Sequence, residues 1–363
     1  MSYVLEKRRG VRAVIDGKEV VVFSTNDYLS LSCHPEVEQA AVDALNRFGS
    51  GSGGAPGTTG TTSVHIQLSK AVAEFKSREK AVLLPSGYQA NIAIHHALGS
   101  DNTVFFLDKR HHPSATDGAR LAKDCRIVRF DHHDLNGFEA LLQSNPAAKQ
   151  VVSIPSVFTI DGDIAPLDKL IRLKDKHGFI LILDEAHASG CLGETGRGLE
   201  EHFGLKGAAD FVMGTFSKAF GASGGFIAFD DDRRSYLKSS FRQLDYSTSI
   251  SPVTAGAALK AMEILKRDSS LMDRLRDSRR AIIENCRQNG IDVIVGQSMI
   301  ILVPCDNCRE LQKRMLFDGY LLMSSEAEIE GDIRSCIRVT ANAAHTEKDI
   351  EGFARALGKN IRL

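Results

Sequence analysis

The stretch GTFSKAFGASGG, Gly214–Gly225, places one lysine, Lys218, in a glycine-lined turn between two apolar runs. These runs, AADFVM before the turn and GGFIAF after it, have the length and composition of buried strands. Most lysines lie on solvated faces, but a lysine among small residues at the end of a strand leaves room for a ligand. Its amine can pair with an anion or, when neutral, attack a carbonyl carbon. The stretch therefore predicts a lysine-centred site at the edge of a sheet.

Composition restricts the classes of protein to which the chain can belong. Its 363 residues are 43% apolar and 25% charged, as in a soluble globular protein with one large and one smaller domain. A net charge of -1 gives no long-range attraction to nucleic acid or to an anionic membrane. The opening residues, MSYVLEKRRG, are charged early, and no apolar run reaches the length of a membrane span. We expect a cytoplasmic protein with no nucleic-acid or membrane partner.

Seven apolar runs alternate with amphipathic stretches through the middle of the chain. Near-continuous apolar strands separated by helices are typical of a mainly parallel sheet with helices on both faces, an α/β fold. In such a sheet, functional residues lie at the carboxyl ends of the strands. The predicted strands are 80–87, 103–108, 125–130, 149–155, 178–187, 209–215 and 224–229.

After Ser249–Pro252 the pattern changes to long helices and short strands. Helices are predicted over 253–268 and 271–290, and strands over 299–304 and 336–341. This pattern indicates a smaller α+β domain, completed by the N-terminal segment 18–31. The expected division is an N-terminal part of the small domain (1–48), a large cofactor-binding domain (49–250) and the C-terminal small domain (251–363).

Asp184 is the second candidate, because it ends the apolar strand LILDEAH. A carboxylate at the end of a buried strand needs a cationic partner to stay ionised. LDEAH also resembles the Mg²⁺-binding box of a helicase, but that interpretation requires a phosphate loop with a lysine. The upstream stretch GAPGTTGTTS has glycines and no lysine. A protonated pyridine nitrogen is the better partner for Asp184.

Together these residues predict a pyridoxal 5'-phosphate (PLP) site. Lys218 would bind the aldehyde, Asp184 the ring nitrogen, and Thr215 with nearby amides the phosphate. PSGYQAN adds Gly87 and Tyr88, whose amides would open a helix and offer a natural phosphate site.

Ordered motifs from about Val21 onward make the chain resemble the α-oxoamine synthases, PLP-dependent transferases of fold type I. The motifs are FSTNDYLSLSCHPEV, GSGG, PSGYQAN, DKRHHPS, VFTIDGDIAPL, LDEAHASGCLGETGRG, GTFSKAFGASGG, YSTSISP and IRVTANAAHT. YSTS and DGDIAPL are most similar to the 8-amino-7-oxononanoate synthases of that family.

The resemblance implies roles for further residues. His187 would bond the phenolic oxygen of the cofactor, and His112 would stack on its ring and act in catalysis with Lys218 and Asp184. Thr159 stands where relatives carry a serine near the cofactor. Asn26 and Arg338 would hold the amino-acid carboxylate, a task that suits the planar fork of arginine.

The remaining histidines and the cysteines are expected to be structural. His111, beside His112, is predicted to be a surface loop residue, and His65, His132 and His133 to be structural. Of the seven cysteines, Cys305 and Cys308 have metal-like spacing, but no second pair completes four ligands. We therefore expect reduced, partly buried thiols and no metal.

The reaction implied by the resemblance joins a small amino acid, with alanine favoured over glycine and serine, to an acyl thioester with loss of CO₂. The acyl donor would be an acyl-CoA or an acyl-carrier protein. A homodimer with a shared active site is implied, in which the GSGGAPGTTG loop reaches the cofactor of the neighbour. A fold-type I aminotransferase and a non-catalytic synthase-like subunit remain as alternatives, although the latter would be expected to lack Lys218.

Three departures from the family pattern affect the predicted acyl-donor side. Pro155 and Ser156 stand where relatives have Glu-Gly, MSSEAEIEGDIRSC (323–336) replaces a proline-rich segment, and the chain begins about twenty residues later than typical relatives. The reaction class is therefore better defined than the substrates.

Overall fold

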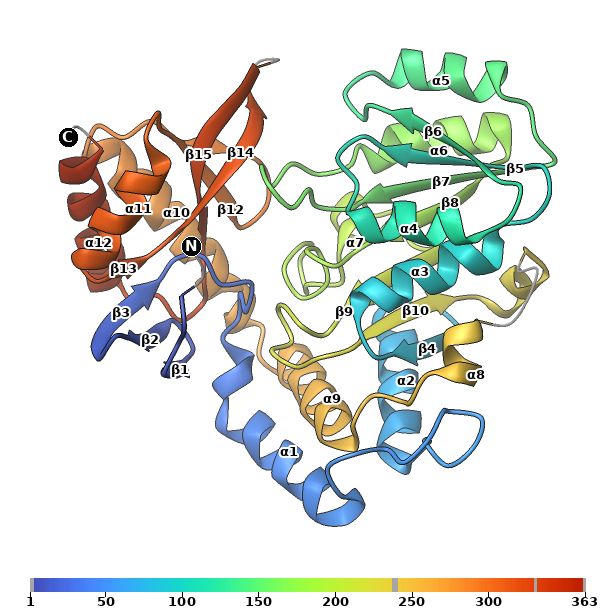
Figure 1. Ribbon diagram of the computed structural model, residues 1–363, viewed down its shortest axis with the longest axis horizontal. Coiled ribbons are helices and arrows are strands. Elements are labelled where there is room, and N and C mark those ends of the chain that lie inside the picture. The colour runs from blue at the N-terminus through green and yellow to red at the C-terminus, as the bar shows by residue number, and fades with distance from the viewer. Residues whose placement is uncertain (1–2, 237–240, 330–331, 362–363) are drawn as a thin grey trace.

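A computed structural model describes residues 3–236, 241–329 and 332–361 of the chain (Figure 1). In these ranges the strands form one seven-stranded sheet and two four-stranded sheets. The seven-stranded sheet lies at the right of Figure 1 and the two smaller sheets lie at the left. None of the helices in the described part is both long and apolar enough to cross a membrane.

The seven-stranded sheet has the order β4-β10-β9-β8-β7-β5-β6, and each of the seven predicted strands is present. Strands β5 to β9 run parallel, whereas β10 is antiparallel to both of its neighbours. The predicted mainly parallel sheet is therefore confirmed. Its strands are β4 (Lys80–Leu84), β5 (Thr103–Asp108), β6 (Arg126–Phe130), β7 (Lys149–Pro155), β8 (Ile180–Asp184), β9 (Phe211–Thr215) and β10 (Gly225–Phe229).

Both faces of this sheet are buried, as its apolar strands predict. Along β5, Val104 and Phe106 lie in one apolar cluster, while Phe105 and Leu107 lie in another on the opposite face. The first cluster includes residues of α2 (Ser63–Phe75), α5 (Leu135–Ser144), α6 (Leu167–His177) and α7 (Leu199–Phe203). The second includes residues of α3 (Gly87–Leu98) and α4 (Pro113–Leu121), with α8 (Arg242–Tyr246) packed against it.

The two smaller sheets combine the ends of the chain. The N-terminal β3 pairs in parallel with the C-terminal β13, so strands from both ends of the chain share one sheet. One sheet has the order β1-β2-β3-β13 and the other β11-β12-β15-β14. Their strands are β1 (Lys7–Arg9), β2 (Arg12–Ile15), β3 (Lys18–Val22), β11 (Ile294–Val295), β12 (Ile300–Pro304), β13 (Tyr320–Leu321), β14 (Met323–Ile329) and β15 (Asp332–Thr340).

Long helices connect the two parts of the molecule. Helix α9 packs against both α1 and α2, and α10 follows it toward the smaller sheets (Figure 1). The domain limits at residues 48 and 250 remain a prediction, and residues 1–2 and 362–363 at its outer ends lie outside the described ranges. The remaining helices are α1 (Pro35–Phe48), α9 (Pro252–Arg267), α10 (Ser270–Gln288), α11 (Cys308–Phe317) and α12 (Glu347–Asn360).

The expectation of reduced thiols at Cys305 and Cys308 is wrong in this structure, which joins them in a disulfide. The turn that leads into α11 brings their Cα atoms to 5.6 Å, a separation that a disulfide can bridge. The cysteines outside this disulfide are Cys33, Cys125, Cys191, Cys286 and Cys336.

Candidate active site

A cavity of about 330 Å³ opens at the carboxyl ends of β7, β8 and β9. Parallel strands end at the same edge of a sheet, so the side chains that follow them converge there. Eight of the predicted site residues line this cavity: Gly87, Tyr88, His112, Thr159, Asp184, His187, Thr215 and Lys218.

Asp184 is held at the end of β8 by two hydrogen bonds. The side-chain amide of Asn91 donates to Oδ2 at 2.7 Å, and the backbone amide of Ala186 donates to Oδ1 at 3.0 Å. The side chain is 5% exposed, so its carboxylate has little water to stabilise a charge. A cationic ring nitrogen in the cavity would supply the missing partner.

A chain of hydrogen bonds connects Asp184 with His112. The Asn91 amide also donates to Ser114 Oγ at 2.9 Å, and this hydroxyl lies 2.7 Å from His112 Nδ1. The chain fixes the imidazole at the start of α4, facing the cavity. Sequence reasoning quoted PSGYQAN and HHPS but assigned no role to Asn91 or Ser114. Both residues lie inside these two motifs, so the motifs could have pointed to them.

Lys218 lies in the turn after β9, in the same cavity as Asp184. Burial lowers its pKa from 10.5 to about 8; the nearby Asp184 carboxylate opposes this shift and the Arg338 guanidinium adds to it. About a tenth of the amine is therefore neutral at pH 7, far more than for an ordinary lysine, and a nucleophile or a proton carrier needs this neutral form.

Capture of added PLP by the cofactor-free protein is expected to accelerate as the pH rises through about 8, the pKa of Lys218. Burial stabilises the neutral amine relative to a lysine in water. Below this pKa, the neutral and therefore reactive fraction falls roughly tenfold per pH unit. Stopped-flow absorbance in the visible range between pH 6 and 10 measures this dependence. A capture rate that keeps rising to a midpoint near 10.5 would contradict the assignment.

The start of α3 provides donors for a phosphate. The first amides of a helix have no partner inside it, and Ser86 caps this helix by accepting from the Gln89 amide at 3.1 Å. The amides of Gly87 and Tyr88 thus remain for a ligand. A Cβ at Gly87 would stand 3.0 Å from Thr215 Cβ, so glycine permits this close approach of α3 to β9.

Thr215 is at the predicted place, but its hydroxyl donates to the Gly224 carbonyl at 2.7 Å. Its hydrogen is therefore used within the protein. Ser217, which also lines the cavity, has its hydroxyl 2.8 Å from that of Thr215 and must be the donor of this hydrogen bond. A phosphate would therefore meet the backbone amides first, and Ser217 could donate to it only by turning its hydroxyl away from Thr215. Sequence reasoning assigned Ser217 no part in the cofactor site. The donors and the aspartate together fit PLP.

His187 contacts a buried tyrosine that sequence reasoning did not assign. Tyr28 Oη lies 2.7 Å from His187 Nδ1 and donates to Asn26 Oδ1 at 3.1 Å. Burial lowers the pKa of His187 well below its ordinary value and raises that of Tyr28 to about 12, so both side chains are neutral. Nε2 of His187 is then the ring nitrogen left for a ligand. Tyr28 lies within the motif FSTNDYLSL, so this motif could have pointed to it.

Asn26 and Arg338 lie beside the cavity rather than in its lining, and they contact each other. Both terminal nitrogens of Arg338 donate weakly to Asn26 Oδ1 at 3.5 Å, while its Nε donates to the Thr159 carbonyl at 2.7 Å. Arg338 is 2% exposed. The structure brings the predicted carboxylate-binding pair together, and their role remains a prediction.

The prediction for His111 is wrong, because this side chain is buried rather than on a surface loop. Its Nε2 lies 2.9 Å from Ser153 Oγ, and burial lowers its pKa to about 4. Neighbouring side chains in the segment after β5 point in opposite directions, so His111 enters the core and His112 faces the cavity. The structural role of His65 is confirmed, since its Nε2 lies 2.8 Å from the Ile250 carbonyl.

His132 and His133 lie apart from the cavity and have structural contacts. His132 Nδ1 is 2.9 Å from buried Asp108, and the Arg110 guanidinium approaches Nε2 of His132 and His133 at 2.8 and 2.7 Å. With Asp131 these histidines could geometrically surround a metal ion. Arg110 already supplies a cation at both ring nitrogens, so the cluster gives no ground for a metal site.

Comparison with known proteins agrees with this geometry. The model of the family "Aminotransferase class I and II" matches residues 18–357. The 8-amino-7-oxononanoate synthase of Thermoanaerobacter pseudethanolicus is 32% identical, over 98% of this chain and 91% of the relative. That of Fervidobacterium nodosum is 34% identical, over 96% and 90%. The chain belongs to the α-oxoamine synthase family.

Solved structures of other proteins are similar to this α-oxoamine synthase over nearly its whole length. A serine palmitoyltransferase from Sphingomonas wittichii is 28% identical with a TM-score of 0.94, covering 99% of this chain and 92% of that chain. The 8-amino-7-oxononanoate synthase of Francisella tularensis, 24% identical, shares the fold with a TM-score of 0.79 over 94% and 98%. The predicted fold type I, the PLP cofactor and the acyltransferase class are confirmed.

Proposed function

We propose that this α-oxoamine synthase condenses a small amino acid with an acyl thioester, releasing CO₂ and a free thiol. The observation that carries the proposal is the position of Arg338, a buried guanidinium beside the cavity that contains Lys218. Its terminal nitrogens have long hydrogen bonds to Asn26 at 3.5 Å, which a carboxylate could replace with stronger ones. An amino acid held there would bring its Cα toward Lys218.

Each residue of the site has a distinct task in this reaction. PLP, when bound, supplies the electron sink. Asp184 would keep the ring nitrogen protonated, and His187 Nε2 would bond the phenolic oxygen. His112 would stack on the ring. Lys218, with a pKa of about 8, carries the proton to and from the amino-acid Cα.

The preferred amino acid is small. Ser217, Ala219, Ala222 and Ser223 surround Lys218 in the sequence and add little bulk to select a side chain. We therefore propose alanine first, by the resemblance to the 8-amino-7-oxononanoate synthases, and glycine or serine next.

The acyl donor is proposed to be an acyl-CoA or an acyl-carrier protein. Pro155, at the place of the family glutamate, lines the cavity. Segment 323–336 contains β14 and most of β15, which pair antiparallel; residues 330 and 331 lie outside the described ranges. Ala327 of β14 and Thr159 line a neighbouring cleft of about 360 Å³, so this departure from the family lies close to the site.

A homodimer with a shared active site is also proposed. The glycine- and threonine-rich loop before α2 is attached to Ser249 through Ser52 and Gly54, with hydrogen bonds of 2.8 and 3.0 Å. This places the loop at the surface, where it can reach a neighbour. Sedimentation of the purified protein measures the oligomeric state, and an active monomer would contradict the proposal.

A two-step screen tests the reaction. Amino acids are first added to the PLP-loaded enzyme and changes in visible absorbance are measured; thioesters are then added and free thiol is assayed. Release of thiol that requires both substrates supports the proposal. Conversion of the cofactor to its amine form by an amino donor alone would favour the aminotransferase instead. The presence of Lys218 argues against a non-catalytic subunit.

Arg338→Ala is expected to raise the KM for the amino acid roughly 10- to 100-fold, the effect of removing a charged hydrogen-bonding pair. The resting visible spectrum should stay unchanged, because Arg338 does not line the cofactor cavity. Arg338→Lys keeps the positive charge but lacks the planar guanidinium. Its KM should lie between those of the unmodified enzyme and Arg338→Ala. Arg334→Ala, an exposed arginine on the same strand, is the control. Normal saturation in Arg338→Ala would show that the carboxylate is held elsewhere.

A further inference from the structure

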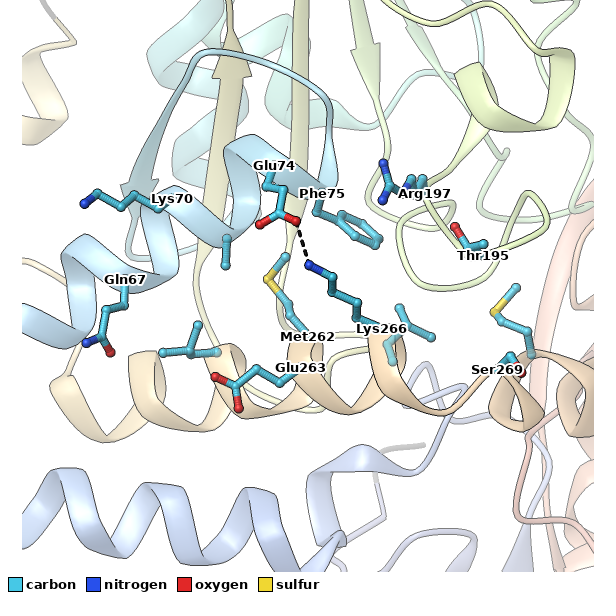
Figure 2. Close-up of a pocket in the computed structure, with 14 residues that line it drawn as sticks. Gln67, Lys70, Glu74, Phe75, Thr195, Arg197, Met262, Glu263, Lys266 and Ser269 are labelled. Carbon is cyan, nitrogen blue, oxygen red and sulfur yellow. Dashed lines mark hydrogen bonds and ion pairs between the residues drawn. The ribbon is translucent and has the colours of Figure 1, made fainter.

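A second cavity, of about 470 Å³, lies between α2 and α9, and the lining residues are drawn in Figure 2. None of the residues that line it also lines the cofactor cavity. Residues of α2 form one wall, residues of α9 the other, and Thr195 and Arg197 close one end (Figure 2). We call this cavity the α2–α9 slot.

The floor of the α2–α9 slot is apolar and elongated. Its wall on α9 runs from Leu259 to Ser269, just beyond the helix, a length of about 15 Å at the helical rise. Methionines adapt their shape to a ligand, and two contribute to the floor. This shape suits an unbranched alkyl chain. The apolar lining residues are Ala71, Phe75, Leu259, Met262, Leu265 and Met272.

Within the described part of the chain, the rim of the slot has more positive than negative side chains without a partner of opposite charge. Both of its carboxylates have lysine partners: Glu74 with Lys266 at 2.6 Å, and Glu263 with Lys260 at 2.5 Å. Among the described residues, Lys70 and Arg197 have no carboxylate within ion-pair distance. The Arg197 side chain has one long hydrogen bond, to Ser77 Oγ at 3.4 Å.

Arg197 projects from a fixed part of the chain. Its carbonyl accepts from Lys76 Nζ at 2.6 Å, and Lys76 pairs with Glu185 at 2.8 Å. Both side chains of this ion pair are almost fully buried. Glu185 also accepts from the Leu199 amide at 2.8 Å, which secures the segment on the far side of Arg197. Because the backbone is already fixed, only the side-chain rotamers of Arg197 would have to be ordered when it binds a ligand.

We propose that the α2–α9 slot binds an unbranched aliphatic carboxylate, with its carboxylate on Arg197 and its chain along the apolar floor. Figure 2 shows Arg197 and Lys70 at opposite ends of the slot, with the Glu74–Lys266 pair between them. The planar guanidinium pairs with both oxygens of a carboxylate, whereas the exposed Lys70 offers a point charge. Phe75 and Met262 would contact the chain. This site is separate from the one proposed for the reaction and does not depend on it.

Calorimetric titration of the PLP-loaded enzyme with decanoate, below its micelle concentration, tests the proposal. We expect saturable binding of one decanoate per chain. Arg197→Gln, which removes the charge, and Ala71→Leu, which fills the floor, should each weaken binding at least about tenfold. Arg280→Gln, an exposed arginine of α10 outside the slot, should leave it unchanged. 1-Decanol, with the same chain and no charge, should bind at least about tenfold more weakly.

Three results would each overturn the proposal. The first is the absence of saturable decanoate binding. The second is binding that both slot variants leave unchanged, which would place the decanoate elsewhere, including the cofactor cavity. The third is equal binding of decanoate and decanol, which would show that the carboxylate does not pair with Arg197. An unchanged visible spectrum of bound PLP in Arg197→Gln and Ala71→Leu verifies that both variants are folded.

Discussion

Lys218→Ala is expected to lose the visible band of the imine between Lys218 and the cofactor and to lower turnover by at least roughly 10²- to 10⁴-fold. The substitution removes both the amine that binds the aldehyde and the group that moves the Cα proton, and a positioned acid or base alone contributes that factor. The cavity keeps its phosphate donors, so PLP should still bind without its covalent link. Absorbance after addition of PLP and the rate of thiol release measure the two losses separately.

The matched control is Lys169→Ala, because Lys169 is an exposed lysine on α6. It should have the absorbance and turnover of the unmodified enzyme. Retention of the visible band in Lys218→Ala would mean that another amine binds the aldehyde. Protein that has no chromophore after addition of PLP, with Lys218 in place, would contradict the assignment of the whole site.

Asp184→Ala is expected to weaken PLP binding and to lower turnover about 10³-fold. Without the carboxylate, the ring nitrogen loses the partner that keeps it protonated, and the sink for electrons is weakened. Asn91 also loses the acceptor of its 2.7 Å hydrogen bond, which loosens the chain to His112. Equilibrium dialysis measures the cofactor, and thiol release measures the rate.

Asp184→Asn separates the charge from the hydrogen bond. Its side-chain oxygen can still accept from Asn91, so His112 stays in place while the negative charge is gone. If the charge carries the effect, this variant should lose nearly as much activity as Asp184→Ala. Turnover close to that of the unmodified enzyme in either variant would show that Asp184 is not the ring partner.

The fold could be predicted well because its signal is local. Each strand of the central sheet is a short apolar run with a helical pattern beside it, and covered parallel sheets produce that pattern. The direction of β10 could not be predicted, since an apolar run has the same composition in either direction. The turn of Lys218 between two strands was predicted, but the antiparallel pairing of these strands with each other was seen only in the structure.

The site could be predicted where its residues follow strands or open helices, as Asp184, Lys218 and Gly87 do. Contacts between distant segments could not be predicted from local patterns, and only the family resemblance assigned Asn26 and Arg338 to the same carboxylate. Tyr28 meets His187 across 159 positions, and Arg338 meets Asn26 across 312. No local pattern marks such pairs.

The two wrong predictions have a related cause. His111 and His112 share a loop of the same composition, and only the path of the backbone decides which imidazole turns inward. Cys305 and Cys308 have a spacing that suits free thiols, a metal or a disulfide. The turn before α11, rather than the spacing, determines that their Cα atoms approach to 5.6 Å.

The position of β10 between β9 and β4 determines the order in which the phosphate end of the site can assemble during folding. β9 and β10 are close in the sequence, so they can pair early. β4 lies more than a hundred positions earlier, so a long loop must close before β4 can pair with β10. The amide of Gly87 follows β4, and a Cβ on Gly225 of β10 would stand only 2.7 Å from it. We therefore expect the lysine turn to form before its phosphate donors arrive. PLP should bind only after this last strand docks, and it should slow unfolding without speeding the refolding of the chain.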